Sequence, residues 1–174
     1  MKTIFRATRD FERHVRQDLE RPHQFAAERV GFLSVRAAST GKALVLLADR
    51  YHPVADEDYV DDRRVGAMMG QEAIRKALEI ALLDPVGMFH IHMHEHRGRP
   101  RFSPIDLREQ LKFVPDFFKV RPEMPHGAIV FSHDRAAGRV WVGPARIHEI
   151  GEFNTIGQPV DIQSASRRRL RFFA

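Results

Sequence analysis

The chain has 174 residues, of which 43% are hydrophobic and 29% charged, and its formal net charge is +5 at pH 7. This length and balance predict one soluble globular domain. No apolar run approaches 18 residues, and residues 1–10 are mixed and charged, so we expect neither a transmembrane helix nor a signal peptide, and a cytoplasmic location is the default expectation. The absence of cysteine excludes disulfides and any thiolate ligand or nucleophile. The positive charge favours acidic partners, but it does not choose between nucleic acid, a membrane surface and an acidic protein.

The N-terminal part of the chain predicts three strands and one helix. Residues 2–7 predict a first strand, and residues 9–20 predict an amphipathic helix with Asp10 as its N-cap. The regions 25–36 and 42–49 predict two further strands, and Thr40 and Gly41 between them fit a hairpin turn. Residues 52–64 are rich in acids and predict an irregular or weakly stranded insert, whose acids are expected to form a solvated loop rather than a metal site.

The remaining elements alternate between helix and strand. Residues 65–83 predict a helix whose apolar stripe includes Ala73, Ala77 and Ala81, and residues 104–115 predict a short helix. Strands are expected at 127–132 and 139–142, joined by 133–138, and residues 147–156 predict a further strand or a short helix. We expect a single domain over residues 1–163 and a basic C-terminal tail over residues 164–174.

One segment, residues 86–106, carries the strongest chemical signal. It holds four histidines at alternate positions, which a strand would place on one face: His90, His92, His94 and His96. A loop follows, and then Ser103 fits the N-cap of a helix whose first turn contains Asp106. Two histidines and Asp106 would supply the three protein ligands of a catalytic zinc, with the fourth position left for water.

This arrangement of His-x-His, a short loop and Ser-x-x-Asp resembles the motif of the JAMM (MPN-plus) zinc metalloproteases, in their bacterial branch. The family also has an upstream Glu-x-x-Gly followed by two apolar residues, and Glu28, Gly31, Phe32 and Leu33 match it. The resemblance covers most of the chain. It implies an α/β (mixed α+β) single-domain fold of the MPN, cytidine-deaminase-like type, with a curved mixed β-sheet flanked by helices.

The resemblance also implies an activity. JAMM enzymes cleave peptide or isopeptide bonds after the C-terminal glycine of ubiquitin and ubiquitin-like proteins. Zinc would be held by two histidines and Asp106, Glu28 would act as the base, and Ser103 would support the oxyanion. The expected partners are a ubiquitin-like protein or its conjugates and an activating or conjugating enzyme system, as in bacterial relatives, some of which belong to antiphage systems.

Two pairs of histidines fit the motif. The family pattern Val-Gly-x-x-His-x-His matches Val86 and Gly87 with His90 and His92 as ligands. The family spacing from the second histidine to the aspartate is about eleven positions, whereas it is fourteen from His92 and twelve from His94. Loops accept insertions at little cost, which slightly favours the first pair over His92 with His94. The chain also departs from the family at Met93, where proline is usual, and His96 is not expected to be a ligand.

Other functional classes explain less of the sequence. A non-catalytic MPN scaffold that binds protein partners is the main alternative, but such relatives lack the ligand set that this chain retains. An amidohydrolase would need a barrel of about 250 residues. The basic tail does not form a recognisable nucleic-acid-binding motif, so we expect neither nucleic acid nor a membrane as a partner.

Overall fold

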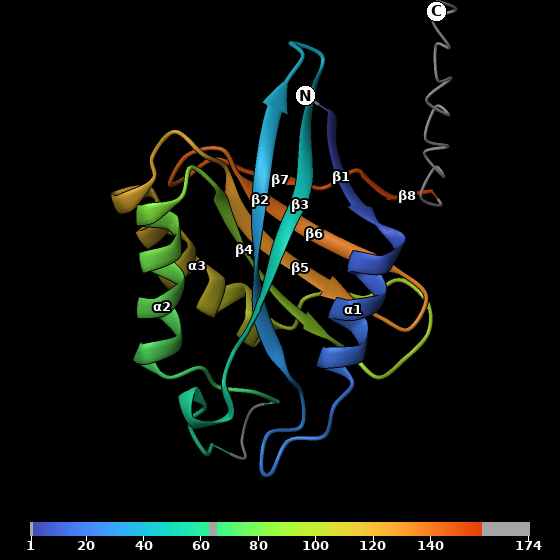
Figure 1. Cartoon of the computed structure of the whole chain (residues 1–174), viewed down its shortest axis with the longest axis vertical. Coiled ribbons are helices and arrows are strands. Elements are labelled where there is room, and N and C mark those ends of the chain that lie inside the picture. The colour runs from blue at the N-terminus through green and yellow to red at the C-terminus, as the bar shows by residue number, and fades with distance from the viewer. Residues whose placement is uncertain (1, 63–65, 158–174) are drawn as a thin grey trace, which may run out of the picture.

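A computed structural model describes residues 2–62 and 66–157, and the predicted basic tail and the domain end at residue 163 lie outside these ranges. The described chain forms one curled mixed sheet with helices on both faces (Figure 1). The helices are α1 (Arg9–Leu19), η1 (Asp56–Asp58, 3-10), α2 (Gln71–Leu83) and α3 (Pro104–Val120). The strands are β1 (Lys2–Thr8), β2 (Val30–Ser39), β3 (Ala43–Pro53), β4 (Gly87–Met93), β5 (His126–Phe131), β6 (Ala136–Trp141), β7 (Ile147–Glu149) and β8 (Glu152–Ile156).

The sheet order is β7-β6-β5-β4-β2-β3-β1-β8. Strand β1 is parallel to β3 and β8, β4 is parallel to β5, and the remaining neighbours are antiparallel. A parallel pair needs a crossover connection, and α3 supplies it between β4 and β5. The expected α/β architecture, with a curved mixed sheet flanked by helices, is confirmed.

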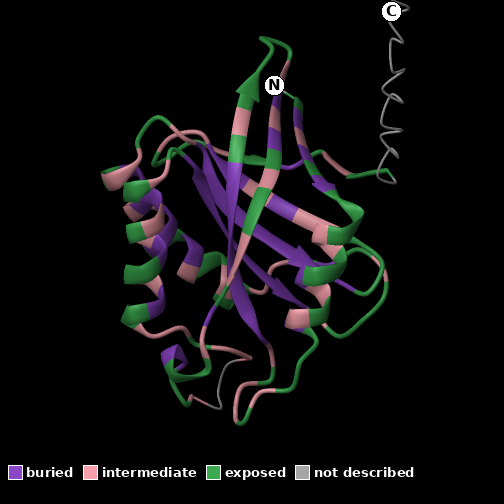
Figure 2. Ribbon diagram, in the orientation of Figure 1, coloured by how far each residue is buried: buried purple, intermediate pink, exposed green. Residues whose placement is uncertain are grey.

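Strand β4 separates two hydrophobic cores and is buried on both faces (Figure 2). Phe89, Ile91 and Met93 point into the core under α1, and Met88 points into the core under α2 and α3. His90 shares the face of Met88, because its ring lies against Phe113 of α3 at 5.4 Å between centroids. The alternation of the strand therefore carries the even-numbered histidines to the face covered by α2 and α3.

The first helix is confirmed, but its predicted N-cap is wrong. Thr8 is the N-cap, and its hydroxyl accepts a hydrogen bond from the Phe11 N–H at 3.2 Å. Asp10 lies within the first helical turn and pairs with Arg13 at 3.1 Å. An acid there is still favourable, because it lies near the positive end of the helix dipole.

The hairpin of β2 and β3 is confirmed, with Gly41 at φ +75° in its turn. The predicted start of its first strand is wrong, because residues 25–29 form a loop. The backbone N–H groups of Ala27 and Glu28 both donate to the carbonyl of Gly66, rather than to a neighbouring strand. Arg29 is buried and pairs with Asp56 at 2.7 Å, so these loop residues are tied to the connection between β3 and α2.

The acidic segment begins with the last two residues of β3 and is otherwise irregular apart from η1, but it is not wholly solvated, and residues 63 and 64 lie outside the described ranges. Asp58 is only 6% exposed and forms an ion pair with Lys76 of α2 at 2.7 Å. A buried carboxylate needs such a partner, since burial alone disfavours its charge. This ion pair connects η1 to α2.

Helix α2 begins later than predicted, after an N-cap at Gly70. Residues 66–70 form a loop in which Met69 pairs with Tyr59 in an isolated β-bridge, so the apolar pattern before Gln71 belongs to the loop. The predicted burial of the alanine stripe is confirmed: Ala73, Ala77 and Ala81 are each at most 4% exposed.

Helix α3 starts at Pro104 as expected, but it continues through Pro115 instead of ending there. Proline removes one helical hydrogen bond, yet buried side chains on both sides of it hold the helix on the sheet: Phe113, Val114, Phe117 and Phe118. Tertiary packing therefore outweighs the local signal.

The two predicted strands after α3 are confirmed as β5 and β6, and the turn between them is shorter than expected because β6 begins at Ala136. Of the two alternatives for residues 147–156, the strand is correct, divided into β7 and β8. Within residues 2–62 and 66–157, no helix combines the length and apolar character required to cross a bilayer.

Candidate metal centre

The alternate histidines form a row along the end of β4. Their successive ring centroids are 5.5, 5.0 and 5.8 Å apart, from His90 through His92 and His94 to His96. His90 and His92 are buried, His94 is partly buried and His96 is exposed. The expectation that these side chains share one side is confirmed, and the row leads from the core to the surface.

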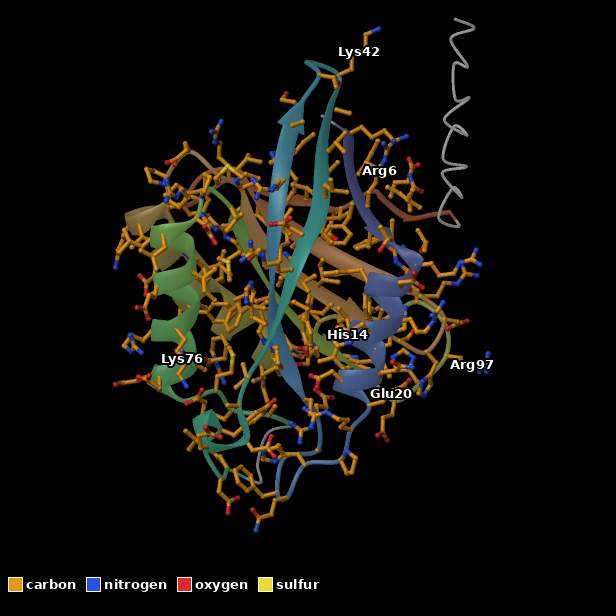
Figure 3. All side chains as sticks on the ribbon, in the orientation of Figure 1. Arg6, His14, Glu20, Lys42, Lys76 and Arg97 are labelled. Atoms are coloured by element: carbon orange, nitrogen blue, oxygen red, sulfur yellow. The ribbon has the colours of Figure 1, made fainter. Side chains whose placement is uncertain are left out.

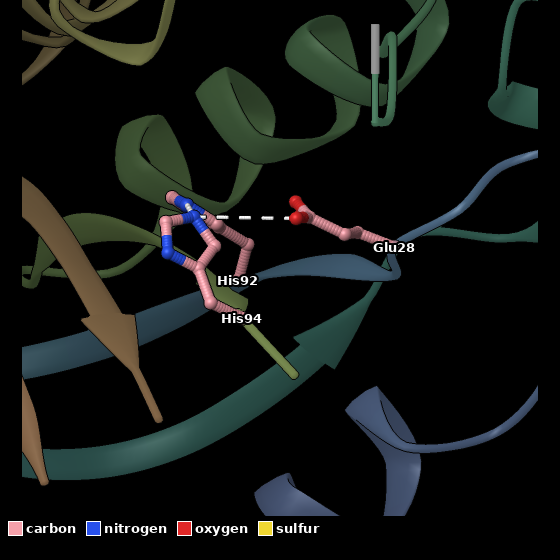
Figure 4. A group of neighbouring side chains, drawn as sticks. All are labelled: Glu28, His92 and His94. Carbon is pink, nitrogen blue, oxygen red and sulfur yellow. Dashed lines mark hydrogen bonds and ion pairs between the residues drawn. The ribbon is translucent and has the colours of Figure 1, made fainter. Parts of the chain in front are cut away.

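Three side chains from two distant segments bring metal-binding atoms together. The Nε2 atoms of His92 and His94 are 3.2 Å apart, and Oε1 of Glu28 is 4.0 Å from Nε2 of His94 (Figure 4). One ligand atom from each of Glu28, His92 and His94 lies within 4.8 Å of the other two. These residues therefore form a group that could hold a metal ion.

Asp106 places a second carboxylate beside His92. Its Oδ2 lies 3.6 Å from Nε2 of His92. The capping box at the start of α3 holds this side chain: the Ser103 N–H donates to Asp106 Oδ2 at 2.7 Å, and the Asp106 N–H donates to Ser103 Oγ at 3.1 Å. The predicted N-cap role of Ser103 is confirmed, and it orients Asp106.

Two of the donor spacings, both measured from His92, fit zinc, although Asp106 is not among the three side chains whose ligand atoms all converge. Zinc bonds to imidazole nitrogen and carboxylate oxygen are about 2.0–2.2 Å long, so neighbouring ligands of a tetrahedral site lie about 3.3 Å apart. The distances of 3.2 Å from His92 to His94 and 3.6 Å from His92 to Asp106 lie close to that value. Glu28 is farther out at 4.0 Å.

His90 has a different environment from the two histidines that follow it. Its ring packs edge-on against Phe32 and Phe113, and its Nδ1 has no hydrogen-bond partner among the described residues. Burial lowers the pKa of His90 to about 3, so this imidazole is neutral. It lies beneath His92 and is not one of the three side chains whose ligand atoms converge.

The two carboxylates of the centre differ in proton affinity. Burial raises the pKa of Glu28 above its ordinary value. Burial also acts to raise the pKa of Asp106, but a contact with His92 and hydrogen bonds from Ser103 outweigh it, so that pKa lies below its ordinary value. Asp106 is thus held as an anion, while Glu28 accepts a proton more readily.

A cavity of about 390 Å³ contains the whole group. Its polar lining includes Glu28, His90, His92, His94, Ser103 and Asp106, and the larger apolar residues on its wall are Met68, Met69, Ile74, Ile105 and Phe113. Polar groups capable of catalysis therefore lie beside apolar surface, as in most small-molecule and peptide sites.

Two residues that sequence reasoning missed also belong to this centre. Gln110 lines the cavity, is 1% exposed, and has no partner for either amide atom within the described residues. Gln110 lies four positions after Asp106, and this spacing on a helix could have indicated that the two side chains share one face. Gly66 accepts the hydrogen bond from the Glu28 N–H, and a Cβ there would lie 3.1 Å from the Glu28 carboxyl carbon. No local pattern links Gly66 to Glu28.

Comparison with known proteins adds no family assignment. No protein-family model matches the chain, and no curated protein matches it at a significant level. The likeness to JAMM enzymes therefore rests on the motif residues themselves.

Proposed function

We propose that this chain is a zinc-dependent peptidase that cleaves after the C-terminal glycine of a ubiquitin-like protein, during precursor processing or deconjugation in the cytoplasm. The observation that carries the proposal is the convergence of Glu28, His92 and His94 in one cavity. The JAMM-like motif, which contains these residues together with Ser103 and Asp106, supports the choice of reaction.

We assign the zinc ligands to His92, His94 and Asp106. The short distances from His92 to the other two side chains support this set. It corresponds to the second of the two alignments of the motif, in which the loop is longer by one residue. His90 then belongs to the floor of the cavity.

When bound, zinc supplies Lewis acidity and makes hydroxide available near neutral pH. Glu28 takes a proton from the attacking water and passes it to the leaving amine. The Ser103 hydroxyl, whose oxygen already accepts a hydrogen bond from the Asp106 N–H, keeps its own proton to donate to the developing oxyanion.

The test is cleavage of a linear fusion that carries a ubiquitin-like domain ending in Gly-Gly. We expect the purified chain to cleave after the second glycine, to lose this activity with a chelator, and to regain it with zinc. His92→Ala should bind little zinc and cleave nothing, because His92 is a ligand in both of the histidine pairs that fit the motif. A wild-type chain that binds no zinc after supplementation would refute the peptidase and favour the non-catalytic scaffold.

A further inference from the structure

A second, positively charged hollow lies next to the metal centre. It has a volume of about 450 Å³ and lies between the loop before α3, the first turn of α3, and strands β6 and β7; its lining residues include Arg99, Arg101, Phe102, Leu107, Arg139 and Glu149. The ring centroid of Phe102 is 6.1 Å from that of His92. A group bound in this hollow would therefore lie next to the metal centre.

Positive charge exceeds negative charge in the hollow. Among the described residues, neither Arg99 nor Arg101 forms an ion pair, and both are exposed. Arg139 lies over the Trp141 ring at 5.1 Å, and it lies 4.0 Å from Glu149, whose side chain is 72% exposed. Three guanidinium groups thus face one weakly held carboxylate.

The loop that carries these arginines is held in place at Gly98. The Gly98 N–H donates to Asp134 at 2.7 Å, and the buried Ser132 hydroxyl donates to the Gly98 carbonyl at 2.6 Å. Gly98 has φ +90°, a conformation that side chains disfavour. A loop fixed in this way loses little conformational freedom when a ligand binds, which favours recognition.

A larger hollow of about 700 Å³ continues the same surface, because it shares Arg99 and Glu149 with the first. Arg16 and Arg135 also line it, together with Glu12 and Asp134. Carboxylates therefore interrupt the positive surface at intervals. A continuous phosphate backbone would be repelled there, whereas separate carboxylates on a peptide can be accommodated between them.

We propose that the hollow around Arg99 and Arg101 binds an acidic segment of a protein, in which Asp or Glu side chains flank an apolar residue. Guanidinium groups bind carboxylates through paired hydrogen bonds, and Phe102 and the 37% exposed Leu107 offer apolar contact between them. That this segment belongs to the peptidase substrate rests on the proposed function; the binding itself does not.

The experiment measures binding of a fluorescein-labelled peptide of alternating Glu and Leu, by anisotropy, to the full chain and two variants. Arg99→Glu/Arg101→Glu should weaken binding by about tenfold or more, and added salt should weaken binding to the wild type. Arg9→Glu/Lys42→Glu is the matched control, with the same change in net charge. Lys42 lies at the tip of the β2–β3 hairpin at the top of the view, whereas Arg97, two residues before Arg99, projects from the right-hand side lower down (Figure 3).

Retained peptide binding in the control supports the proposal. An equal loss of affinity in both variants would show that only the net charge matters, and this result would overturn the proposal. No binding, or tighter binding of a single-stranded oligonucleotide than of the peptide, would also overturn it. Both variants should keep the zinc content and melting temperature of the wild type. Peptide binding without cleavage of the Gly-Gly fusion would refute only the peptidase, and cleavage without peptide binding would refute only this surface.

Discussion

The Nε2 atoms of His92 and His94 lie 3.2 Å apart although β4 ends between the two residues, at Met93. The backbone explains this proximity, because the His94 N–H still donates to the Phe131 carbonyl of β5 at 2.9 Å. The extended conformation therefore continues for one residue beyond the strand and keeps the side-chain period of two. A buried imidazole and a partly buried one can act on the same ion.

This relationship predicts different effects of two histidine substitutions. His94→Ala should lower zinc affinity by more than about 100-fold, since even outer-shell changes cost 10–100-fold. His90→Leu should retain about one zinc per chain, because its imidazole lies outside the converging group. Titration against a chelator of known affinity measures both. Loss of zinc in His90→Leu but not in His94→Ala would show that the first pair of the motif binds the metal.

Substitution of the two carboxylates should separate zinc binding from catalysis. Glu28→Gln should keep zinc but reduce cleavage by about 100-fold or more, because the amide cannot take up a proton. Asp106→Asn should lose most of the zinc, because Asp106 lies close to His92 and is held as an anion. Metal analysis and initial rates on the Gly-Gly fusion test this. The reverse pattern, with zinc lost in Glu28→Gln and kept in Asp106→Asn, would make Glu28 the ligand.

Gly31 of the Glu-x-x-Gly segment should be intolerant of any side chain. A Cβ there would overlap Cε2 of Tyr51, and that ring is held by a 2.7 Å hydrogen bond from its hydroxyl to Asp18. Gly31→Ala should therefore lower the free energy of unfolding by about 1–3 kcal/mol, as overpacking typically does. Gly157→Ala is the control, because nothing lies within 4 Å of its Cβ position. Equal urea midpoints for the two variants would contradict the argument.

His126 should make stability depend on pH. Its Nδ1 accepts from the Met88 N–H at 3.0 Å, and its Nε2 is 2.9 Å from the Arg121 carbonyl, so the neutral ring satisfies both contacts. Burial lowers the pKa of His126 to about 4, below the unfolded value of about 6.5. Between these values the unfolded chain binds more protons. This contribution is therefore complete above pH 6.5 and is lost as the pH falls towards 4, by about 3 kcal/mol.

Urea unfolding of wild type and His126→Gln across that range measures the effect. The variant should be less stable than wild type at pH 7, and the difference should shrink as the pH falls. A difference that stays constant from pH 7 to pH 4 would mean that His126 does not titrate between the folded and unfolded states in this range.

The buried amide of Gln110 should lower the free energy of unfolding of the wild-type chain. Both of its amide atoms are buried without partners in the described part of the chain, and an unsatisfied buried polar group costs about 1–3 kcal/mol. Gln110→Met, similar in shape and apolar, should raise the free energy of unfolding by about 1 kcal/mol. Gln110→Glu is a useful contrast, since it places a charge in the same surroundings and should destabilise. Destabilisation by Gln110→Met would indicate that the amide is hydrogen-bonded to water.

Local patterns in the sequence were sufficient to predict several elements of the structure. The alternation of the histidines, the Ser103–Asp106 capping box and the alanine stripe of α2 depend on neighbouring residues and on fixed periods of the backbone, so they could be predicted. The predictions that failed depended on contacts across the fold. Helix α3 continues through Pro115 because buried aromatic side chains hold it on the sheet.

The residue types of the centre and their order along the chain can be identified in the amino-acid sequence. Which of these residues come into contact depends on the folded chain. Glu28 reaches the histidines because its backbone bonds to Gly66, a residue 38 positions later. His92 and His94 converge because β5 pairs with β4 and with the residue beyond its end. Backbone hydrogen bonds between distant segments set these distances, and a one-dimensional pattern does not encode them.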